Sequence, residues 1–482
     1  MKASSQNKWL ALLGLGMGVF MATLDASIVN ISLPTLVRVF NTSFATVQWV
    51  VLSYVVVLAS LMLGIARLGD MRDKKRIYLT GLGLFTFSSF LCGLSPSIGW
   101  LIGFRALQGL GAVMMQALGN ALVTQIVSPS ERGRALGLMG TTVSVGIAIG
   151  PPLGGLLIGS IGWQSVFWVN VPVGILTALA VLRFVPACPP PNPHQRFDAV
   201  GALVLFFTLG AYALGMTLGQ DAGFSSPTVR ALLLSALAGL LVFILIEKRV
   251  PQPMLDLNLF RNPFFSINLM MGFLVFVVLA GGFIMPFYLE NVKGFSVQMT
   301  GLFLMANPIL MGITAPIAGS LSDRFGSRVI SLMGLLLIVA GCIAFGTLRA
   351  DTNTFGILWR LGVLGLGMGM FQSPNNSAIM GAVPRERLGV ASGLIGLSRT
   401  LGNSTGLPLM GSLFTAQVLA SRFYQSGVEI TRAEPQALVD GITGMYHIAA
   451  GVVLLSALLA SLALWMDTRR KRAAHSIQPT QG

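Results

Sequence analysis

The sequence predicts an all-α polytopic membrane protein with fourteen transmembrane helices. Of its 482 residues, 54% are hydrophobic and only 10% are charged, and the mean hydropathy is +0.79. Apolar runs of 18 or more residues recur along the whole chain, and each is long enough to cross about 30 Å of hydrocarbon. Soluble domains do not combine so many long apolar runs with so few charges.

The candidate spans follow one another through short loops. They cover residues 9–31, 45–68, 77–95, 98–127, 134–158, 165–185, 199–218, 229–247, 266–289, 298–321, 328–348, 355–381, 389–415 and 442–466. A count of twelve transmembrane helices would require that the candidate spans 199–218 and 229–247 do not cross the membrane. No convincing cleavage site follows the first span, so we interpret it as a retained helix and not as a signal peptide.

Charge predicts the orientation of the chain. Of the 31 Lys and Arg residues, 22 lie in the even-numbered loops and the two tails, six lie on the opposite face, and three lie within spans. The basic face is cytoplasmic by the positive-inside rule, so both termini are predicted to be cytoplasmic in a bacterial inner membrane. The net charge of +15 then reflects topology and contact with anionic lipids, and not nucleic-acid binding.

The sequence does not predict a metal site, a cofactor site, an enzyme or an ATP-driven pump. The three Cys and three His residues are scattered, so the sequence predicts no metal site and no cofactor, and the protein is not expected to be an enzyme. An integral membrane enzyme, which would need clustered catalytic groups, remains a remote alternative. A primary pump is excluded because no Gly-x-x-x-x-Gly-Lys-Ser/Thr loop is present.

An internal repeat divides the chain. Residues 137–155 match residues 393–411 at eight of nineteen positions, so spans 2–5 recur as spans 10–13. The predicted parts are an N-terminal six-helix half (1–185), linkers with two inserted helices (186–265), a C-terminal six-helix half (266–466) and a basic cytoplasmic tail (467–482). Two parallel repeats are a plan of secondary transporters, in which substrate binds at the repeat interface near the midplane.

Asp25 is the acid that the sequence places deepest in the membrane, because it interrupts the apolar run 9–37. An intramembrane carboxylate is a functional candidate by default. Its predicted partner is Arg105 of the fourth span, since a helix rises about 1.5 Å per residue and the two residues then lie at similar depths. The alternative is an Arg105 that extends to the outer interface.

The loop after span 2, Gly64–Arg76, and its counterpart Gly319–Arg328 resemble the Gly-x-Leu-x-Asp-Arg-x-Gly-Arg-Arg signature of the major facilitator superfamily. The first copy departs from it at Ala66, Met71 and Asp73. The resemblance implies the major facilitator fold and a conformational latch; a basic loop that only fixes topology is the alternative. The latch residues would be Asp70, Arg72, Asp323, Arg324 and Arg328.

A glycine-rich stretch in span 5 resembles the antiporter motif of the same superfamily. Its residues are Gly146, Gly150, Pro151, Pro152, Gly154 and Gly155. Small residues four apart let helix backbones approach closely, and the prolines bend the helix. The resemblance implies a tightly packed hinge that resists leak; ordinary packing of small residues is the alternative.

Four segments resemble signatures of the fourteen-helix drug:proton antiporter family. They are Leu24–Pro34, Gly162–Gly174, Phe197–Gly201 and Pro253–Phe260. The resemblance implies proton-coupled export of amphipathic or lipophilic small molecules, with Asp25 and Arg105 in proton coupling. A specific metabolite or lipid exporter of the same fold is the alternative. The implied partners are the substrate, protons and the lipid bilayer. A monomer is the expected functional unit. The resemblance leaves open whether a periplasmic adaptor also takes part.

Further polar or flexible side chains within the spans are candidates for the substrate cavity. They are Gln48, Tyr54, Met114, Gln116, Asn120, Gln372 and Asn376. Gln116 and Asn120 lie four residues apart and so share a helix face. Hydrogen bonding between helices is the alternative role for the polar members of this set.

The predicted topology is tested by single cysteines at Ser4 and Ser476. Neither should react with a membrane-impermeant maleimide in intact cells, because both positions are predicted to be cytoplasmic. Reaction of either cysteine in intact cells would contradict the orientation.

Overall fold

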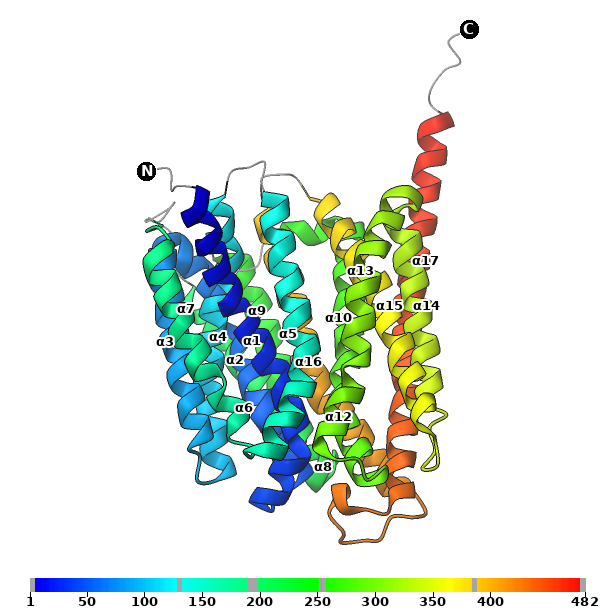
Figure 1. The fold of residues 1–482 in the computed structure, drawn as a ribbon. Coiled ribbons are helices and arrows are strands. Elements are labelled where there is room, and N and C mark those ends of the chain that lie inside the picture. The colour runs from blue at the N-terminus through cyan, green and yellow to red at the C-terminus, as the bar shows by residue number, and fades with distance from the viewer. Residues whose placement is uncertain are drawn as a thin grey trace.

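A computed structural model describes residues 5–127, 132–188, 198–250, 253, 257–383 and 388–476. Within these ranges the regular secondary structure is helical, without β-strands. The helices form one bundle, in which α1 (Ser5–Phe40) starts at the end where α17 (Pro435–Ser476) finishes (Figure 1). We call this the terminal end of the bundle, and the opposite end the distal end.

The N-terminal half is built around α1 and α4. Its elements are α1, α2 (Phe44–Met71), α3 (Lys74–Gly93), α4 (Ile98–Ile126), α5 (Arg132–Ser160), α6 (Ser165–Trp168) and α7 (Asn170–Phe184). Helix α1 packs against α4, α5 and α7, while α4 packs against α2 and α3. Short connections start new helices at capping residues: Ser43 Oγ accepts from the Thr46 amide, and Asp73 Oδ1 accepts from the Lys75 amide.

The C-terminal half repeats this arrangement with one irregular helix. Its elements are η1 (Leu257–Arg261), α10 (Pro263–Leu279), η2 (Ala280–Ile284), α11 (Met285–Phe287), η3 (Tyr288–Val292), α12 (Val297–Leu304), α13 (Ala306–Phe325), α14 (Ser327–Phe345), α15 (Thr354–Gly381), α16 (Leu388–Ala420), η5 (Ile430–Arg432) and α17. The stretch 280–292 passes through 3₁₀, α and π turns. Such local changes of helical hydrogen bonding leave backbone groups available for other partners.

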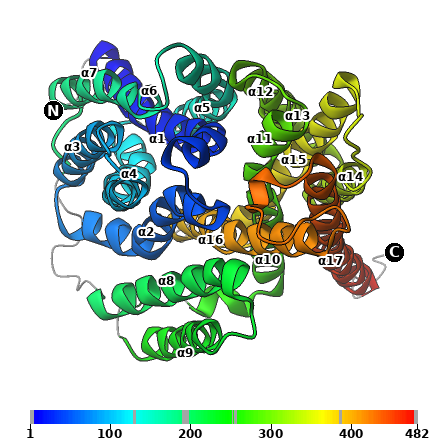
Figure 2. The same cartoon turned by 90° about the horizontal axis from the view of Figure 1, so that it is seen from below.

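Helices α8 (Ala199–Ala222) and α9 (Pro227–Arg249) lie outside the two halves. Figure 2 shows α8 alongside α2 and α16, with α9 on its outer side. Tyr212 Oη on α8 donates to the Thr405 carbonyl at 3.3 Å, and Ser412 Oγ donates to the Met216 carbonyl at 3.0 Å. The inserted pair therefore covers the seam between the halves on one side.

The bundle contains many helices of membrane-spanning length. In its described residues, eleven helical stretches are long and apolar enough to span a membrane. Helices α3, α5 and α16 lie in the same bundle but are not among them. Helix α3 starts with three basic residues, and α16 carries the polar run Ser398–Thr400, which lowers their hydropathy. Fourteen crossings therefore stays a prediction.

Helix α5 joins the two halves at the distal end. Gly150 and Gly154 face α1, where an added Cβ would meet Ser27 and Ile28. Gly155 faces α12 of the other half: its Cβ would lie 2.5 Å from the Val297 carbonyl oxygen. The predicted antiporter motif thus supplies glycines to two faces of α5, one within its own half and one across the interface.

Aromatic and charged contacts add to this distal interface. Phe44 on α2 packs on Phe283, Phe287 and Phe414 of the other half, with ring centroids 5.3–5.7 Å apart. Arg38 Nη2 lies 2.8 Å from Glu290 Oε2. At this end the halves are therefore held together by backbone contact, packed aromatic rings and an ion pair.

We expect Gly155→Val to open the distal end, because a β-branched side chain there meets backbone atoms of α12 that cannot move independently of the helix. Spin labels at the exposed positions Ser160 and Met299, in a background without native cysteines, would report the separation of α5 and α12. The distance distribution should shift to longer values. Gly103→Val is the matched control, since an added Cβ at Gly103 meets nothing within 4 Å. Equal distributions for both variants would contradict the assigned role of Gly155.

Candidate functional site

Asp25 lies fully buried in the middle of α1, enclosed by the other helices of its half. Its carboxylate accepts three hydrogen bonds. Arg105 Nη1 donates to Oδ2 at 2.6 Å, and Gln108 Nε2 and Asn170 Nδ2 each donate to Oδ1 at 2.9 Å. Three N–H donors, one of them charged, replace the water that a buried carboxylate loses.

Arg105 on α4 is as buried as its partner. Its Nε donates to the Val50 carbonyl of α2 at 2.9 Å, and its Cζ lies 4.4 Å from the centre of the Tyr54 ring and 5.9 Å from that of Phe167. The guanidinium therefore has a carboxylate, a carbonyl and an aromatic face as partners. The structure thus brings together the pair that the depth argument predicts, and Arg105 does not extend to the interface.

Gln108 connects the pair to α3. It follows Arg105 by one helical turn, its Oε1 accepts from Arg105 Nη1 at 2.6 Å, and its Nε2 donates to Ser89 Oγ at 2.6 Å. Cys92 Sγ lies 3.8 Å from the same Oε1. The sequence analysis missed Gln108, Ser89 and Asn170. The signal for Gln108 was its spacing of three residues from Arg105, which places both on one helix face.

The predicted cavity residues of the N-terminal half do not gather at one place. Tyr54 belongs to the ion-pair cluster, and its hydroxyl has no hydrogen-bond partner among the described residues. Gln48 is buried at the interface, where it packs against Gly411 of α16. Met114 packs on Gly81 of α3, so it is an intrahalf contact. Gln116 is half-buried on α4, and the side chain of Asn120 lies outside the described residues.

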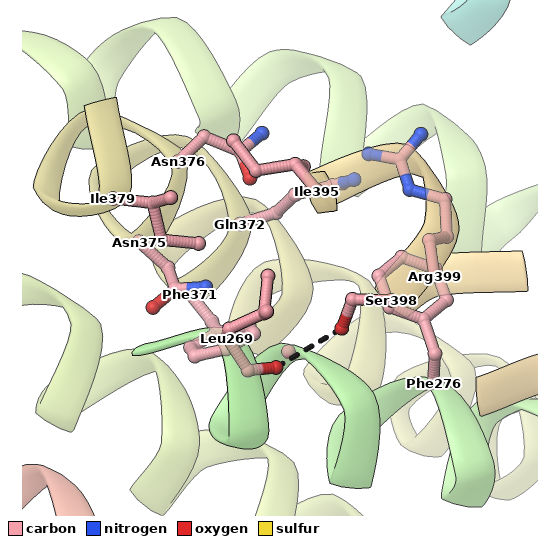
Figure 3. A pocket seen from close by; sticks show the side chains of 11 residues that line it. Leu269, Phe276, Phe371, Gln372, Asn375, Asn376, Ile379, Ile395, Ser398 and Arg399 are labelled. Atoms are coloured by element: carbon pink, nitrogen blue, oxygen red, sulfur yellow. Dashed lines mark hydrogen bonds between the residues drawn. The ribbon is translucent and has the colours of Figure 1, made fainter. Parts of the chain in front are cut away.

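Gln372 and Asn376, by contrast, line one pocket in the C-terminal half. It lies between α10, α15 and α16, and Figure 3 shows both amides on the same side of the pocket as the Arg399 guanidinium. Asn375 Nδ2 donates to the Asn268 carbonyl at 3.2 Å, and Ser398 Oγ donates to the Leu269 carbonyl at 3.0 Å. These two bonds fix α15 and α16 to α10 beneath the pocket.

The predicted latch residues are only partly described. The side chains of Asp70 and Asp323 lie outside the described residues, although both positions are in helices. Arg72 and Arg324 are exposed, and Arg328 Cζ lies 4.3 Å from the ring centre of Phe264. The latch therefore stays a prediction.

Asp73, where the first loop departs from the family signature, has a local structural role. Besides capping α3, its carboxylate lies 4.0 Å from Arg76 Nε and accepts from the Cys188 amide at 3.4 Å. In the described part of the chain, no group of three or more His, Cys, Asp or Glu side chains is placed to hold a metal ion.

Comparisons with known proteins agree with this architecture. Residues 15–407 match the Major Facilitator Superfamily. The chain is 32% identical over 458 residues to the riboflavin transporter RibZ of Clostridioides difficile, covering 94% of this chain and 97% of that protein. It is 33% identical over 461 residues to the multidrug resistance protein Stp of Mycobacterium tuberculosis, covering 92% and 85% of the two chains.

The fold is similar to that of a solved transporter. A crystal structure of a bacterial homologue of the human lysosomal transporter Spinster aligns with a TM-score of 0.70 and 18% identity, covering 96% of this chain and 98% of the other. The superfamily and the fold are those of membrane transporters, which are not enzymes. The extent of the sequence match and the helical bundle together show that the chain belongs to the major facilitator superfamily.

Proposed function

We propose that this protein is a proton-coupled antiporter that exports amphipathic or lipophilic small molecules by alternating access. The observation that carries the proposal is the buried Asp25–Arg105 pair at 2.6 Å. A carboxylate in a transmembrane helix is costly, and proton relays in pumps and transporters are one established use of such acids. The similarity to a multidrug resistance protein supports efflux as the direction.

Proton uptake at Asp25 requires a change in its contacts. In the described state, both carboxylate oxygens accept N–H bonds and no part of the side chain is exposed. A proton on either oxygen would displace a donor. Gln108 Oε1 and the Val50 carbonyl still accept from Arg105 when Asp25 is neutral, so the guanidinium keeps partners in both protonation states. Such a site can exchange a proton without leaving Arg105 uncompensated.

A physical connection links this site to the interface between the halves. Ser27, two residues after Asp25, donates through Oγ to the Ile147 carbonyl of α5 at 3.0 Å. Helix α5 in turn contacts α12 through Gly155. A shift of α1 on protonation would therefore act on the contacts that hold the distal end together. We propose that the distal end, on the less basic side of the membrane, opens to the periplasm.

The alternative function is export of a specific metabolite, and the similarity to a riboflavin transporter supports it. The similarity to a riboflavin transporter extends over nearly the whole chain, as does the similarity to a multidrug resistance protein. Under this proposal both functions would use the same coupling site and would differ in the substrate pocket. Transport assays across dyes, antiseptics and metabolites separate them.

We expect Asp25→Asn to abolish uphill transport, because an amide cannot exchange the coupled proton. The measurement uses inverted vesicles energised with a proton gradient: accumulation should fall to the level of empty vesicles, and substrate should no longer release protons. Exchange of labelled for unlabelled substrate without a gradient should continue. Asp440→Asn, which changes an acid hydrogen-bonded at the distal end of α17, is the control. Normal uphill transport by Asp25→Asn would place the coupling site elsewhere.

We expect Gln108→Leu to shift the pH profile of transport to higher pH. The substitution removes one of the three donors to Asp25 without changing net charge, and a carboxylate with fewer donors favours its protonated form. Substrate-induced proton release from purified protein, measured across pH, reports the shift. Ser235→Ala on α9, whose hydroxyl bonds only within its helix, should leave the profile unchanged. A profile for Gln108→Leu that overlays the unsubstituted protein would remove Gln108 from the coupling site.

A further inference from the structure

Arg399 on α16 is the least compensated of the three arginines that lie within spans. In the described part of the chain it forms no ion pair, and its Nε is buried without a hydrogen-bond partner. Its Cζ lies 5.1 Å from the ring centre of Phe276, a contact that only partly replaces hydration. A guanidinium does not lose its charge in a protein, so a counter-charge from elsewhere would stabilise it.

The other two arginines show what full compensation looks like. Arg105 is paired with Asp25. Arg360 donates to the carbonyls of Ala344 and Gly356 at 2.7 and 2.6 Å and to Thr347 Oγ1 at 2.8 Å. Among the described residues Arg399 has no comparable set of partners, although it lies further from the nearer end of its helix than Arg360 does. The missing partner is therefore a property of this position and not of membrane arginines in this protein.

The surroundings of Arg399 have the composition of a binding site. Gln372 and Asn376 present amides on one face of α15, and neither forms a hydrogen bond with the described residues. Phe276 and Phe371 provide aromatic surface in the same pocket. One cation and adaptable amides suit an anionic group. The cavity holds only about 10 Å³ in this state, so an apolar body attached to that group requires the pocket to widen along Phe276 and Phe371.

The charges in the N-terminal half also favour an anionic ligand for this pocket. The negative charge of Asp25 is compensated by Arg105 and enclosed by its own half, so it offers nothing to a cation in the pocket. Arg399 leaves the described interior of the C-terminal half positively charged. An anion entering this pocket gains attraction, whereas a cation is repelled.

We propose that Arg399 anchors the anionic group of an amphipathic organic anion, a carboxylate, sulfonate or phosphate, while Gln372 and Asn376 orient it and Phe276 contacts its apolar body. This site would add a substrate class to the proposed antiporter function. Transport of the anion rests on that function, whereas binding of the anion does not.

Binding of matched dyes to purified protein in neutral detergent tests the anchor without a proton gradient. Fluorescein is a xanthene anion and tetramethylrhodamine ethyl ester a xanthene cation. The unsubstituted protein should bind fluorescein more tightly than the cation, as measured by fluorescence anisotropy. Arg399→Gln should weaken fluorescein binding about tenfold or more, which is the effect of losing a charge-assisted hydrogen bond. The same substitution should not weaken binding of the cationic dye. Arg399→Lys should keep most of the affinity.

Two controls separate binding from folding and from coupling. Arg422→Gln removes a charge outside the pocket and should leave both affinities unchanged, and all variants should remain monodisperse with similar thermal stability. Asp25→Asn should bind fluorescein normally. If Arg399→Gln has no effect while Asp25→Asn abolishes proton exchange, the anchor fails and the antiporter proposal stands. If the anchor is found but no substrate releases protons, the coupling proposal fails instead.

A lipid headgroup presents the same anionic chemistry, so the assay is repeated in lipid nanodiscs. Equal fluorescein affinity in phosphatidylcholine and in phosphatidylglycerol discs is expected. Loss of binding in phosphatidylglycerol would assign Arg399 to lipid and overturn the substrate proposal. It would also be overturned if the unsubstituted protein bound none of three anions that differ in headgroup, namely fluorescein, anilinonaphthalene sulfonate and flavin mononucleotide.

Discussion

The fold of the N-terminal half depends on compensating two charges where water is absent. Removing a carboxylate and a guanidinium from water costs several kcal/mol per ion unless each finds partners of good geometry. Asp25 and Arg105 find them on α1, α2, α4 and α7, and Gln108 extends the set to Ser89 on α3. Helices α2, α3, α4 and α7 must therefore keep their positions relative to α1 for the pair to stay satisfied. Protonation of Asp25 would remove one of these charges and so, under the proposed function, would alter the contacts between these helices.

A second constraint acts between the halves, where polar attraction has a smaller part. Helices in a membrane gain little from hydrophobic burial against each other, so close packing has to supply the attraction. Gly155 lets α5 reach the backbone of α12, and Phe44 fills the space between α2 and the C-terminal half. Packing of this kind is lost as a unit when a helix moves, because interlocked surfaces are bistable and do not deform continuously. Such packing suits the interface that the proposed alternating access would open and close.

The sequence predicts the helical class, the superfamily and the partnership of Asp25 and Arg105, because these follow from hydropathy, motif and depth. It does not predict which way a side chain faces on a helix that is apolar all round. Met114 and Gln48 illustrate this: both looked like cavity residues, yet one packs on Gly81 and the other on Gly411. Gln372 and Asn376 do line a pocket, but nothing in the sequence alone shows that Arg399 lies beside them without a carboxylate.

The two halves share a repeat but differ in electrostatics, and this difference suggests a division of labour. The repeat pairs Arg105 with Arg360. Arg360, however, is held by the Ala344 carbonyl at the end of α14, the Gly356 carbonyl at the start of α15 and Thr347 Oγ1, and no carboxylate takes the place of Asp25 among its described contacts. In the described part of the C-terminal half, Arg399 instead forms no ion pair, and its buried Nε has no hydrogen bond. Proton exchange in one half and anion binding in the other would then communicate through the interface, since both α5 and α16 contact the opposite half. A carrier built in this way can evolve its substrate pocket while its coupling site stays intact.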